Sequence, residues 1–287
     1  MTTTAPQLLR FRQLLARLFG WAYAERDTEQ LGSVLTERAA QASMTPEDYL
    51  NRLTARPWTG EATALVERLS ITETHFFRHG EQFRALREEA LPARIAARSA
   101  ERALRMMSVA CSSGEEAYSL AIAARQRQPD RDWLISVLGL DANTAVLARA
   151  VAGRYSAWSL RETPEPARRR WFHRDDDGFL VADELRQMVQ FRRHNVAGPD
   201  DGRWRPGRYD VIFCRNLLMY LTPAVADTLI ARMTGALAPG GYLFLGHTDS
   251  LGAAPAGLEL RHSHEAFYYR RAGGPAPAQR DACGARR

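Results

Sequence analysis

Residues 106–120, MMSVACSSGEEAYSL, decide how the rest of the chain is interpreted. The apolar beginning is typical of a buried strand that ends at 111–114, and a helical pattern starts at Glu115 and Glu116. A strand, a tight turn and a helix N-terminus leave unpaired backbone N–H groups beside the positive end of a helix dipole. In α/β proteins such a place holds the polar part of a nucleotide-like ligand.

The two carboxylates after the turn indicate the charge of that ligand. Glu115 and Glu116 would repel a phosphate and attract a cation, so S-adenosylmethionine, with its ammonium and sulfonium groups, fits and ATP does not. Asp141 ends the next predicted strand, 27 residues after Gly114. An acidic residue there can accept hydrogen bonds from both hydroxyls of an adenosine ribose, although Asp141 could also be a simple helix cap. Because the chain has no GxGxxG motif, NAD is a poor candidate.

The composition is that of an ordinary folded protein with room for a full core, with 287 residues, 45% hydrophobic and 25% charged. The net charge of +6 comes from arginine alone, since no lysine occurs, and the arginines are scattered. Scattered arginines favour solvated surface over a nucleic-acid face, with a basic face for an acidic partner as the functional alternative. The three cysteines have no metal-ligand spacing, and no signal peptide or long apolar run occurs. We therefore expect a cytoplasmic protein with no metal site, no nucleic-acid partner and no direct membrane insertion.

The N-terminal part is predicted to be helical. Apolar residues recur at helical spacing over 8–19, and a second such pattern starts at Leu31. Thr45 and Pro46 form a good helix start, and a further helix is expected over 61–69. These apolar positions are typical of a core.

From Leu104 onward, predicted strands and helices alternate, which favours a doubly wound, mostly parallel α/β sheet with right-handed crossovers. The strands are expected over 104–110, 134–140, 209–214 and 242–246, and the helices over 115–126, 144–151 and 223–237. Ligands of such sheets lie beyond the carboxyl ends of the strands, where this chain has 111–116, Asp141, 215–216 and His247.

An interruption separates the second strand from the later ones. Pro164 and Pro166 break the pattern, and short strands are expected at 179–181 and 188–192, near the acidic turn 175–178. This predicts a small antiparallel insert, either for partner contact or simply filling the fold. The consecutive acids of the turn lack a ligand loop and indicate solvated surface.

Four motifs in order give the chain a resemblance to a known family. They are TETHFFR at 72–78, ACSSGEEAYS at 110–119, FCRNLLMY at 213–220 and LAPGGYLFLGH at 237–247. Over about residues 8–270 the chain closely resembles the CheR family, the chemoreceptor protein-glutamate O-methyltransferases.

The resemblance implies a division of the chain into domains. It implies an N-terminal helical domain, 1–85, and a class I S-adenosylmethionine-dependent methyltransferase domain, 86–271, with a β-subdomain inserted at about 163–194. The Pro- and Ala-rich remainder, 272–287, is expected to be a flexible tail.

The resemblance also implies the site residues for S-adenosylmethionine and its product S-adenosylhomocysteine. The implied cofactor contacts are Thr72, Thr74, Arg78, Glu116, Asp141, Asn195, Val196, Arg215 and Asn216. Nearest the reacting centre it places Arg78, which would hold the incoming carboxylate by a bidentate pair, and the hydroxyl of Tyr220. Tyr220 could also be an aromatic packed under the sheet edge. A carboxylate with an ordinary pKa of about 4.3 is already ionised at neutral pH, so its methylation needs no general base.

The implied substrate is the glutamate side chains of the cytoplasmic helical domain of a chemoreceptor-like protein. Family members that dock a receptor's C-terminal pentapeptide tend to have a longer, glycine-rich loop where this chain has only 173–178, so we expect no pentapeptide docking. Arg52, Arg56 and Arg68 on the N-terminal helices could face the acidic receptor. The alternatives are a regulatory module that binds S-adenosylmethionine, or a methyltransferase with another substrate.

Overall fold

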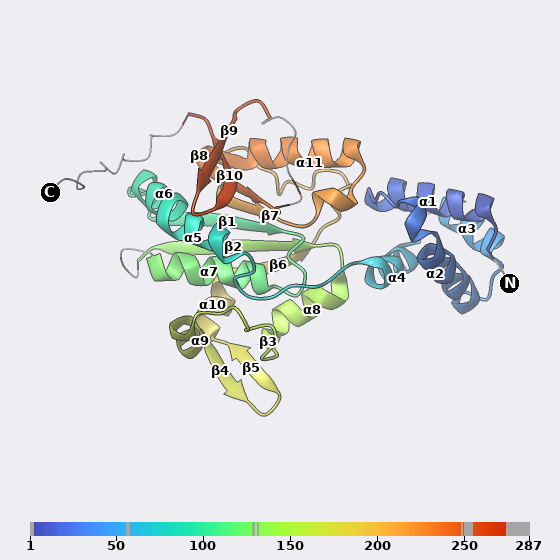
Figure 1. The fold of residues 1–287 in the computed structure, drawn as a ribbon, viewed down its shortest axis with the longest axis horizontal. Helices are drawn as coiled ribbons and strands as arrows, with labels where there is room; N and C mark the ends of the chain where they lie inside the picture. The colour runs from blue at the N-terminus through green and yellow to red at the C-terminus, as the bar shows by residue number, and fades with distance from the viewer. Residues whose placement is uncertain are drawn as a thin grey trace.

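The computed structural model describes residues 3–55, 58–127, 130, 132–247, 249 and 255–273. Figure 1 shows a group of N-terminal helices at one end, a large sheet between helices in the middle, and a small sheet that projects from it. No helix in these ranges is long and apolar enough to cross a bilayer.

Four N-terminal helices form a core of their own. They are α1 (Ala5–Phe19), α2 (Thr28–Gln41), α3 (Pro46–Ala55) and α4 (Thr59–Leu69). The predicted start of α3 is confirmed, because the Asp48 amide donates to Thr45 Oγ1 at 3.1 Å. Inside this core, the buried carboxylate of Glu61 pairs with Arg38 at 2.7 Å.

The segment after α4 joins the helices to the sheet. It leads through Phe76 and Phe77 into α5 (Gly80–Ala85), a π-helical turn (Leu86–Ala90) and α6 (Leu91–Ala97). Both phenylalanines belong to the core of the sheet, whereas the core of the N-terminal helices extends only to Leu69. The domain boundary at residue 85 stays a prediction.

The large sheet has seven strands in the order β6-β2-β1-β7-β8-β10-β9. The strands are β1 (Ala103–Val109), β2 (Leu134–Asp141), β6 (Val189–Arg193), β7 (Tyr209–Cys214), β8 (Leu237–Leu245), β9 (Leu258–Ser263) and β10 (Ala266–Arg271). The first five strands in this order are parallel, and β10 is antiparallel to both of its neighbours. The predicted doubly wound, mostly parallel sheet is confirmed, and the strand order reverses between β1 and β7.

Helices cover both faces of this sheet, with α11 on one side and α7 on the other (Figure 1). The crossover helices are α7 (Glu115–Arg127), α8 (Thr144–Ala152), α10 (Asp183–Met188) and α11 (Pro223–Ala236). Ten consecutive residues of α7, 115–124, are buried, because the helix lies between the sheet and neighbouring helices.

The small sheet has three antiparallel strands in the order β3-β5-β4, and α9 (Glu165–Trp171) lies between β3 and β4 in the sequence. They are β3 (Arg154–Tyr155), β4 (Phe172–Asp175) and β5 (Gly178–Val181). The prediction that the strand at 188–192 belongs to this insert is wrong. That strand forms as β6 and pairs with β2 in the large sheet. Of the predicted tail, 272–287, all but Ala272 and Gly273 lies outside the described residues.

Candidate active site

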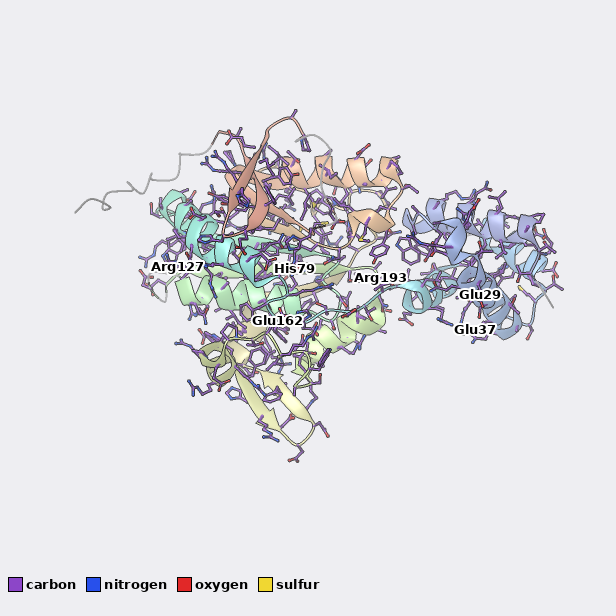
Figure 2. All side chains as sticks on the ribbon, viewed as in Figure 1. Glu29, Glu37, His79, Arg127, Glu162 and Arg193 are labelled. Atoms are coloured by element: carbon purple, nitrogen blue, oxygen red, sulfur yellow. The ribbon has the colours of Figure 1, made fainter. Side chains whose placement is uncertain are left out.

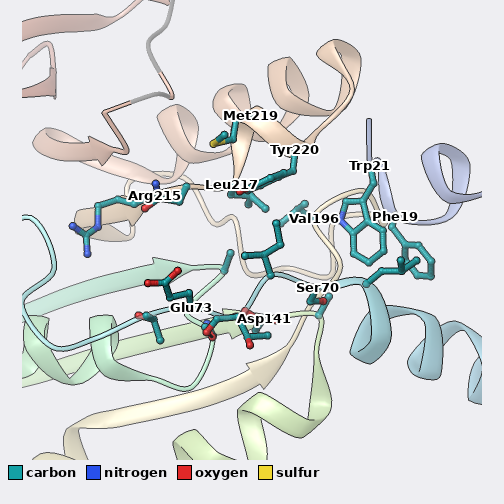
Figure 3. Close-up of a pocket in the computed structure, with 18 of the residues that line it drawn as sticks. Phe19, Trp21, Ser70, Glu73, Asp141, Val196, Arg215, Leu217, Met219 and Tyr220 are labelled. Carbon is teal, nitrogen blue, oxygen red and sulfur yellow. Dashed lines mark hydrogen bonds between the residues drawn. The ribbon is translucent and has the colours of Figure 1, made fainter. Parts of the chain in front are cut away.

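A cavity of about 390 Å³ lies at the carboxyl ends of β1, β2 and β7, next to the point where the strand order reverses. Its wall includes the turn after β1, the end of β2, the loop after β6, the loop after β7, the segment after α4, and the end of α1. In Figure 3, Trp21 and Phe19 lie on one side, Arg215 lies on the other, and Val196 projects between them.

All the predicted site residues line this one cavity. They are Thr72, Thr74, Arg78, Glu116, Asp141, Asn195, Val196, Arg215, Asn216 and Tyr220. The structure therefore brings together residues from five separate stretches of sequence. Their roles as ligand contacts and catalytic groups stay predictions.

The turn after β1 is held in an unusual backbone conformation by Asp141. Ala110, Ser112 and Gly114 all have positive φ angles, of 58°, 49° and 94°. Non-glycine residues adopt this region at an energetic cost, and such outliers are common at binding sites. The Ser112 amide donates to Asp141 Oδ2 at 2.8 Å, and the Asn143 amide donates to Oδ1 at 2.9 Å. Asp141 thus fastens the turn to the end of β2.

Asp141 is not the cap of α8, because Asn143 Oδ1 accepts from the first amides of that helix. Burial raises the pKa of the Asp141 carboxyl, and the amide hydrogen bonds from Asn143 and Ser112 oppose this shift. The carboxylate lies at the place where a sugar with two hydroxyl groups could bind.

Of the two glutamates at the start of α7, Glu116 lines the cavity. Its Oε1 accepts from Ser108 Oγ at 2.7 Å, and its Oε2 accepts from Arg215 Nε at 2.6 Å. Glu115 is buried, accepts from Ser113 Oγ at 2.7 Å, and has its pKa raised by burial. Glu115 is therefore a structural group of the turn, and Glu116 is the carboxylate that a ligand can reach.

The two arginines among the predicted contacts differ in how their charge is used. Arg215 is buried, pairs with Glu116, and donates to the carbonyl of Arg78 and to Gln82 Oε1. Arg78 is half-buried and donates from Nη1 to the Glu73 carbonyl at 3.0 Å. Among the residues that the structure describes, no carboxylate forms an ion pair with Arg78. Its charge is available for an anionic substrate.

The end of α1 supplies an aromatic wall that the sequence did not predict. Phe19, Trp21 and Tyr23 line the cavity, and the rings of Phe19 and Trp21 are 4.7 Å apart. Their positions are fixed by backbone contacts, since Trp21 bridges to Leu221 and the Ala22 amide donates to the Tyr220 carbonyl at 2.8 Å. The periodicity of 8–19 indicated only a helix core. The aromatic sequence WAY directly after Gly20 was the available signal.

Asn195 lies in the cavity wall, but its side chain forms a hydrogen bond to the end of α1. Its Nδ2 donates to the Leu18 carbonyl at 2.7 Å, and its Oδ1 accepts from the Ala197 amide at 3.1 Å. His247, which the sequence also placed at a strand end, does not line the cavity.

The chemistry of the cavity fits S-adenosylmethionine. Carboxylates of Asp141 and Glu116 can meet hydroxyl groups and an ammonium, and Leu140, Val196 and Leu217 form an apolar wall suited to a flat base. The cavity volume lies in the usual range for sites of small cofactors.

Comparisons with known proteins agree with this chemistry. The family model described as CheR methyltransferase, SAM binding domain, matches residues 72–267. Chemotaxis protein methyltransferase 2 of Vibrio cholerae is 34% identical over 193 residues, which are 67% of this chain and 66% of that protein. A probable biofilm formation methyltransferase, WspC, of Pseudomonas aeruginosa is 32% identical over 91% of this chain and 61% of its own length. Chemotaxis protein methyltransferase 2 of Pseudomonas aeruginosa is 32% identical over 86% of this chain and 87% of its own length.

The chain thus spans slightly less than two thirds of the first two of these relatives. Among solved structures, a putative S-adenosyl-L-methionine-dependent methyltransferase from Methanococcus maripaludis covers 74% of this chain and 100% of its own, at 13% identity and a TM-score of 0.35.

The family model covers every predicted site residue, from Thr72 to Tyr220, and it is the model of a SAM-binding domain. The cofactor is therefore S-adenosyl-L-methionine, and the sheet with its crossover helices is a class I methyltransferase fold. Because the match extends over more than half of the chain, the chain belongs to the CheR methyltransferase family.

Proposed function

We propose that this protein transfers a methyl group from S-adenosylmethionine to the side-chain carboxylates of glutamates in a chemoreceptor-like signalling protein. The observation that carries the proposal is the difference between Arg215, whose charge is neutralised by Glu116, and Arg78, which has no carboxylate partner among the described residues. An uncompensated guanidinium at the cofactor cavity is suited to an anionic substrate. The relatives named as chemotaxis protein methyltransferases supply the substrate class.

The proposed reaction needs alignment more than acid–base chemistry. The bound cofactor supplies a methyl group on a positively charged sulfur. A glutamate oxygen, already ionised at neutral pH, forms the new O–CH₃ bond while the S–CH₃ bond breaks, and the electron pair stays on the sulfur of S-adenosylhomocysteine. Both charges disappear in this step, so a site with little water favours it.

The side chains of the cavity have separate parts in this mechanism. Arg78 holds the incoming carboxylate through paired N–H donors, and the Tyr220 hydroxyl donates a hydrogen bond near the methyl group. Val196 and Leu217 exclude water from the cofactor. Holding two reactants in line can supply up to about 7 to 11 kcal/mol of the rate enhancement.

The way in which the substrate docks is part of the proposal. The hairpin between β4 and β5 closes tightly, because Asp175 pairs with Gly178 and leaves two residues between them. This short acidic turn supports docking on the receptor's helical domain without capture of a C-terminal pentapeptide. On the N-terminal helices, Arg52 lies 5.4 Å from the Trp58 ring centroid, Arg68 pairs with Glu37 at 3.0 Å, and Arg56 lies outside the described residues. Of Arg52 and Arg68, Arg52 is therefore the better candidate contact with the receptor.

Two further predictions belong to the proposal. We place the protein in the cytoplasm, where the buried thiols of Cys111 and Cys214 would stay reduced. We also divide the chain at about residues 85 and 271, with the inserted β-subdomain, predicted at about 163–194, ending before β6.

The test is methyl transfer from labelled S-adenosylmethionine to the membrane fraction of the source cell, followed by mapping of the modified residue. We expect a base-labile ester on receptor glutamates. The variant Arg78→Ala should abolish transfer while calorimetry still shows cofactor binding and circular dichroism an intact fold. Arg84→Ala is the matched control, since Arg84 on α5 is exposed, pairs with Glu88 in the following π-helical turn, and lies outside the cavity.

Two results would reject the proposal. Label on a molecule other than a receptor glutamate would reject the substrate, and full turnover of Arg78→Ala would reject the role of Arg78. The relatives include one named for biofilm formation, so the receptor is to be identified from the modified protein itself.

A further inference from the structure

Three potential metal ligands meet outside the cavity, at the joint between α5 and the end of β8. They are His79, which precedes α5, Glu81 in its first turn, and His247 just after β8. One ligand atom from each lies within 4.8 Å of those from the other two. His247 Nε2 is 2.6 Å from Glu81 Oε1, and the two imidazole rings are 4.5 Å apart. Figure 2 shows His79 in the part of the molecule that contains the sheets, away from the N-terminal helices.

His79 is held at this joint at an energetic cost. Its φ angle is 62°, in the left-handed region, which a non-glycine residue adopts only at an energetic cost. Its Nδ1 atom is buried and has no hydrogen-bond partner among the described residues. A buried polar atom without a partner adds a desolvation penalty to this cost. A bound cation that accepts the lone pair of Nδ1 would account for both the left-handed backbone of His79 and the missing partner of this atom.

We propose that His79, Glu81 and His247 bind a divalent transition-metal ion, with Zn²⁺ as the best match. Two imidazole nitrogens and one carboxylate oxygen are a known Zn²⁺ ligand set, with a fourth position left for water. Mg²⁺ and Ca²⁺ prefer sites made of oxygen alone, so they fit this set less well.

The geometry leaves the ligands room to close around an ion. Zn²⁺ needs donors at about 2.0 to 2.2 Å, so the three atoms must move toward one another. The side chains of His247 and Glu81 are 48% and 29% exposed and are free to make this adjustment. His79 does not need to move far, because the other two can approach it.

Charges around the joint set a limit on affinity. Glu81 supplies one negative charge, whereas Arg215 contacts the carbonyl of Arg78, the residue before His79, and brings a positive charge close. We therefore expect weaker binding than at structural zinc sites, which have several anionic thiolates.

The site is connected to the active-site cavity through the side chain of Gln82. Gln82, next to Glu81, accepts from Arg215 through Oε1 and donates from Nε2 to the Leu245 carbonyl at 2.7 Å. An ion held by His79, Glu81 and His247 would thus tie α5 to the end of β8 directly beside Arg78.

The test measures binding of Zn²⁺ to the purified full chain by competition with a chromophoric chelator, and binding of Co²⁺ by its visible absorption. We expect one ion per chain, and more than tenfold weaker binding in Glu81→Gln and His247→Ala. In His79→Asn the new residue tolerates the left-handed backbone, and the same loss is expected. If that variant fails to fold, the two variants at the more exposed positions decide the outcome.

Two matched controls complete the design. His173 is exposed on β4 in the small sheet, and His264 lies 3.5 Å from Glu88 and 3.7 Å from Glu89. His173→Ala and His264→Ala should bind the ion as the wild type does. Unchanged binding in Glu81→Gln and His247→Ala, loss only in His264→Ala, or no binding by the wild type would overturn the assignment.

Discussion

Arg215 Nε lies 2.6 Å from Glu116 Oε2, and both side chains are almost fully buried, at 3% and 9% exposure. The same guanidinium contacts the carbonyl of Arg78. One buried cation thus joins the loop after β7, the start of α7 and the segment that carries Arg78.

Breaking this pair should destabilise the protein strongly. In Arg215→Ala the carboxylate of Glu116 stays buried without its partner, which typically costs about 3 to 5 kcal/mol. The double variant Arg215→Ala/Glu116→Gln leaves neither charge, so it should lose less than the sum of the single variants. Unfolding in urea measures all three. Additive losses would show that the two side chains do not interact.

Asp141→Ala should weaken cofactor binding more than it affects stability. The variant removes the acceptor of the Ser112 amide, so the turn after β1 loses its hydrogen bond to the end of β2. We expect calorimetry to show at least tenfold weaker binding of S-adenosylmethionine. The folded state raises the pKa of Asp141, so the ionised form carries a burial penalty that grows as the pH rises through that pKa. The alanine variant removes this penalty, which offsets the lost hydrogen bonds at neutral pH. Asp227→Ala, at an exposed position on α11, is the control. Unchanged affinity in Asp141→Ala would reject the ligand role.

The sequence predicted the strand, turn and helix at 103–127 well, because their signals are local. An apolar run, a glycine turn and a helix start follow one another directly, and the motifs at the other strand ends then had to meet at the same edge of the sheet. Chain order and strand polarity were enough to bring Asp141 and Arg215 to the turn after β1.

The pairing of β6 could not be predicted from its own residues. Val189 and Phe191 alternate with polar residues, and such a strand fits either sheet equally well. The choice depends on distant glycines, since a Cβ atom on Gly139 would lie 2.7 Å from Phe191 Cδ1, and one on Gly114 would lie 2.8 Å from Phe191 Cζ. The missing side chains make the space that Phe191 fills beside β2.

The aromatic wall leads to a prediction for the N-terminal helices. Trp21→Ala should weaken binding of S-adenosylmethionine, because the half-buried indole lines the cavity and packs on Phe19. Trp21→Phe should retain most of the affinity. Trp158→Ala is the control, since Trp158 is 69% exposed and lies outside the cavity. Calorimetric titration of the three variants checks this, and equal affinity in Trp21→Ala and Trp158→Ala would contradict it.

His194 should make the stability of the protein fall in mild acid. Burial, with Arg203 and Arg232 nearby, lowers the pKa of His194 to about 4. Asp201 lies 3.1 Å from Nδ1, but it also pairs with Arg203, which largely neutralises its negative charge. Nε2 is buried with no partner in the described part of the chain, so a proton added there would be costly.

The direction of the effect follows from the lowered pKa. The unfolded chain takes up the proton near the ordinary pKa of 6.5, whereas the folded chain does so only near 4. The contribution of His194 is therefore complete above 6.5 and is lost as the pH falls toward 4. At 1.36 kcal/mol per pKa unit, the loss is at most about 3 kcal/mol.

The variant His194→Gln isolates this contribution from that of the buried carboxyl groups, whose raised pKa values act in the opposite direction. The free energy of unfolding in urea should decrease less between pH 7.5 and 4.5 in His194→Gln than in the wild type. His262→Gln, at an exposed position on β9, should follow the wild type. Parallel curves for the wild type and His194→Gln would show that the fold does not hold the imidazole neutral. In this pH range the unfolded wild type takes up a proton on His194 and the folded wild type should not, whereas glutamine takes up none in either state.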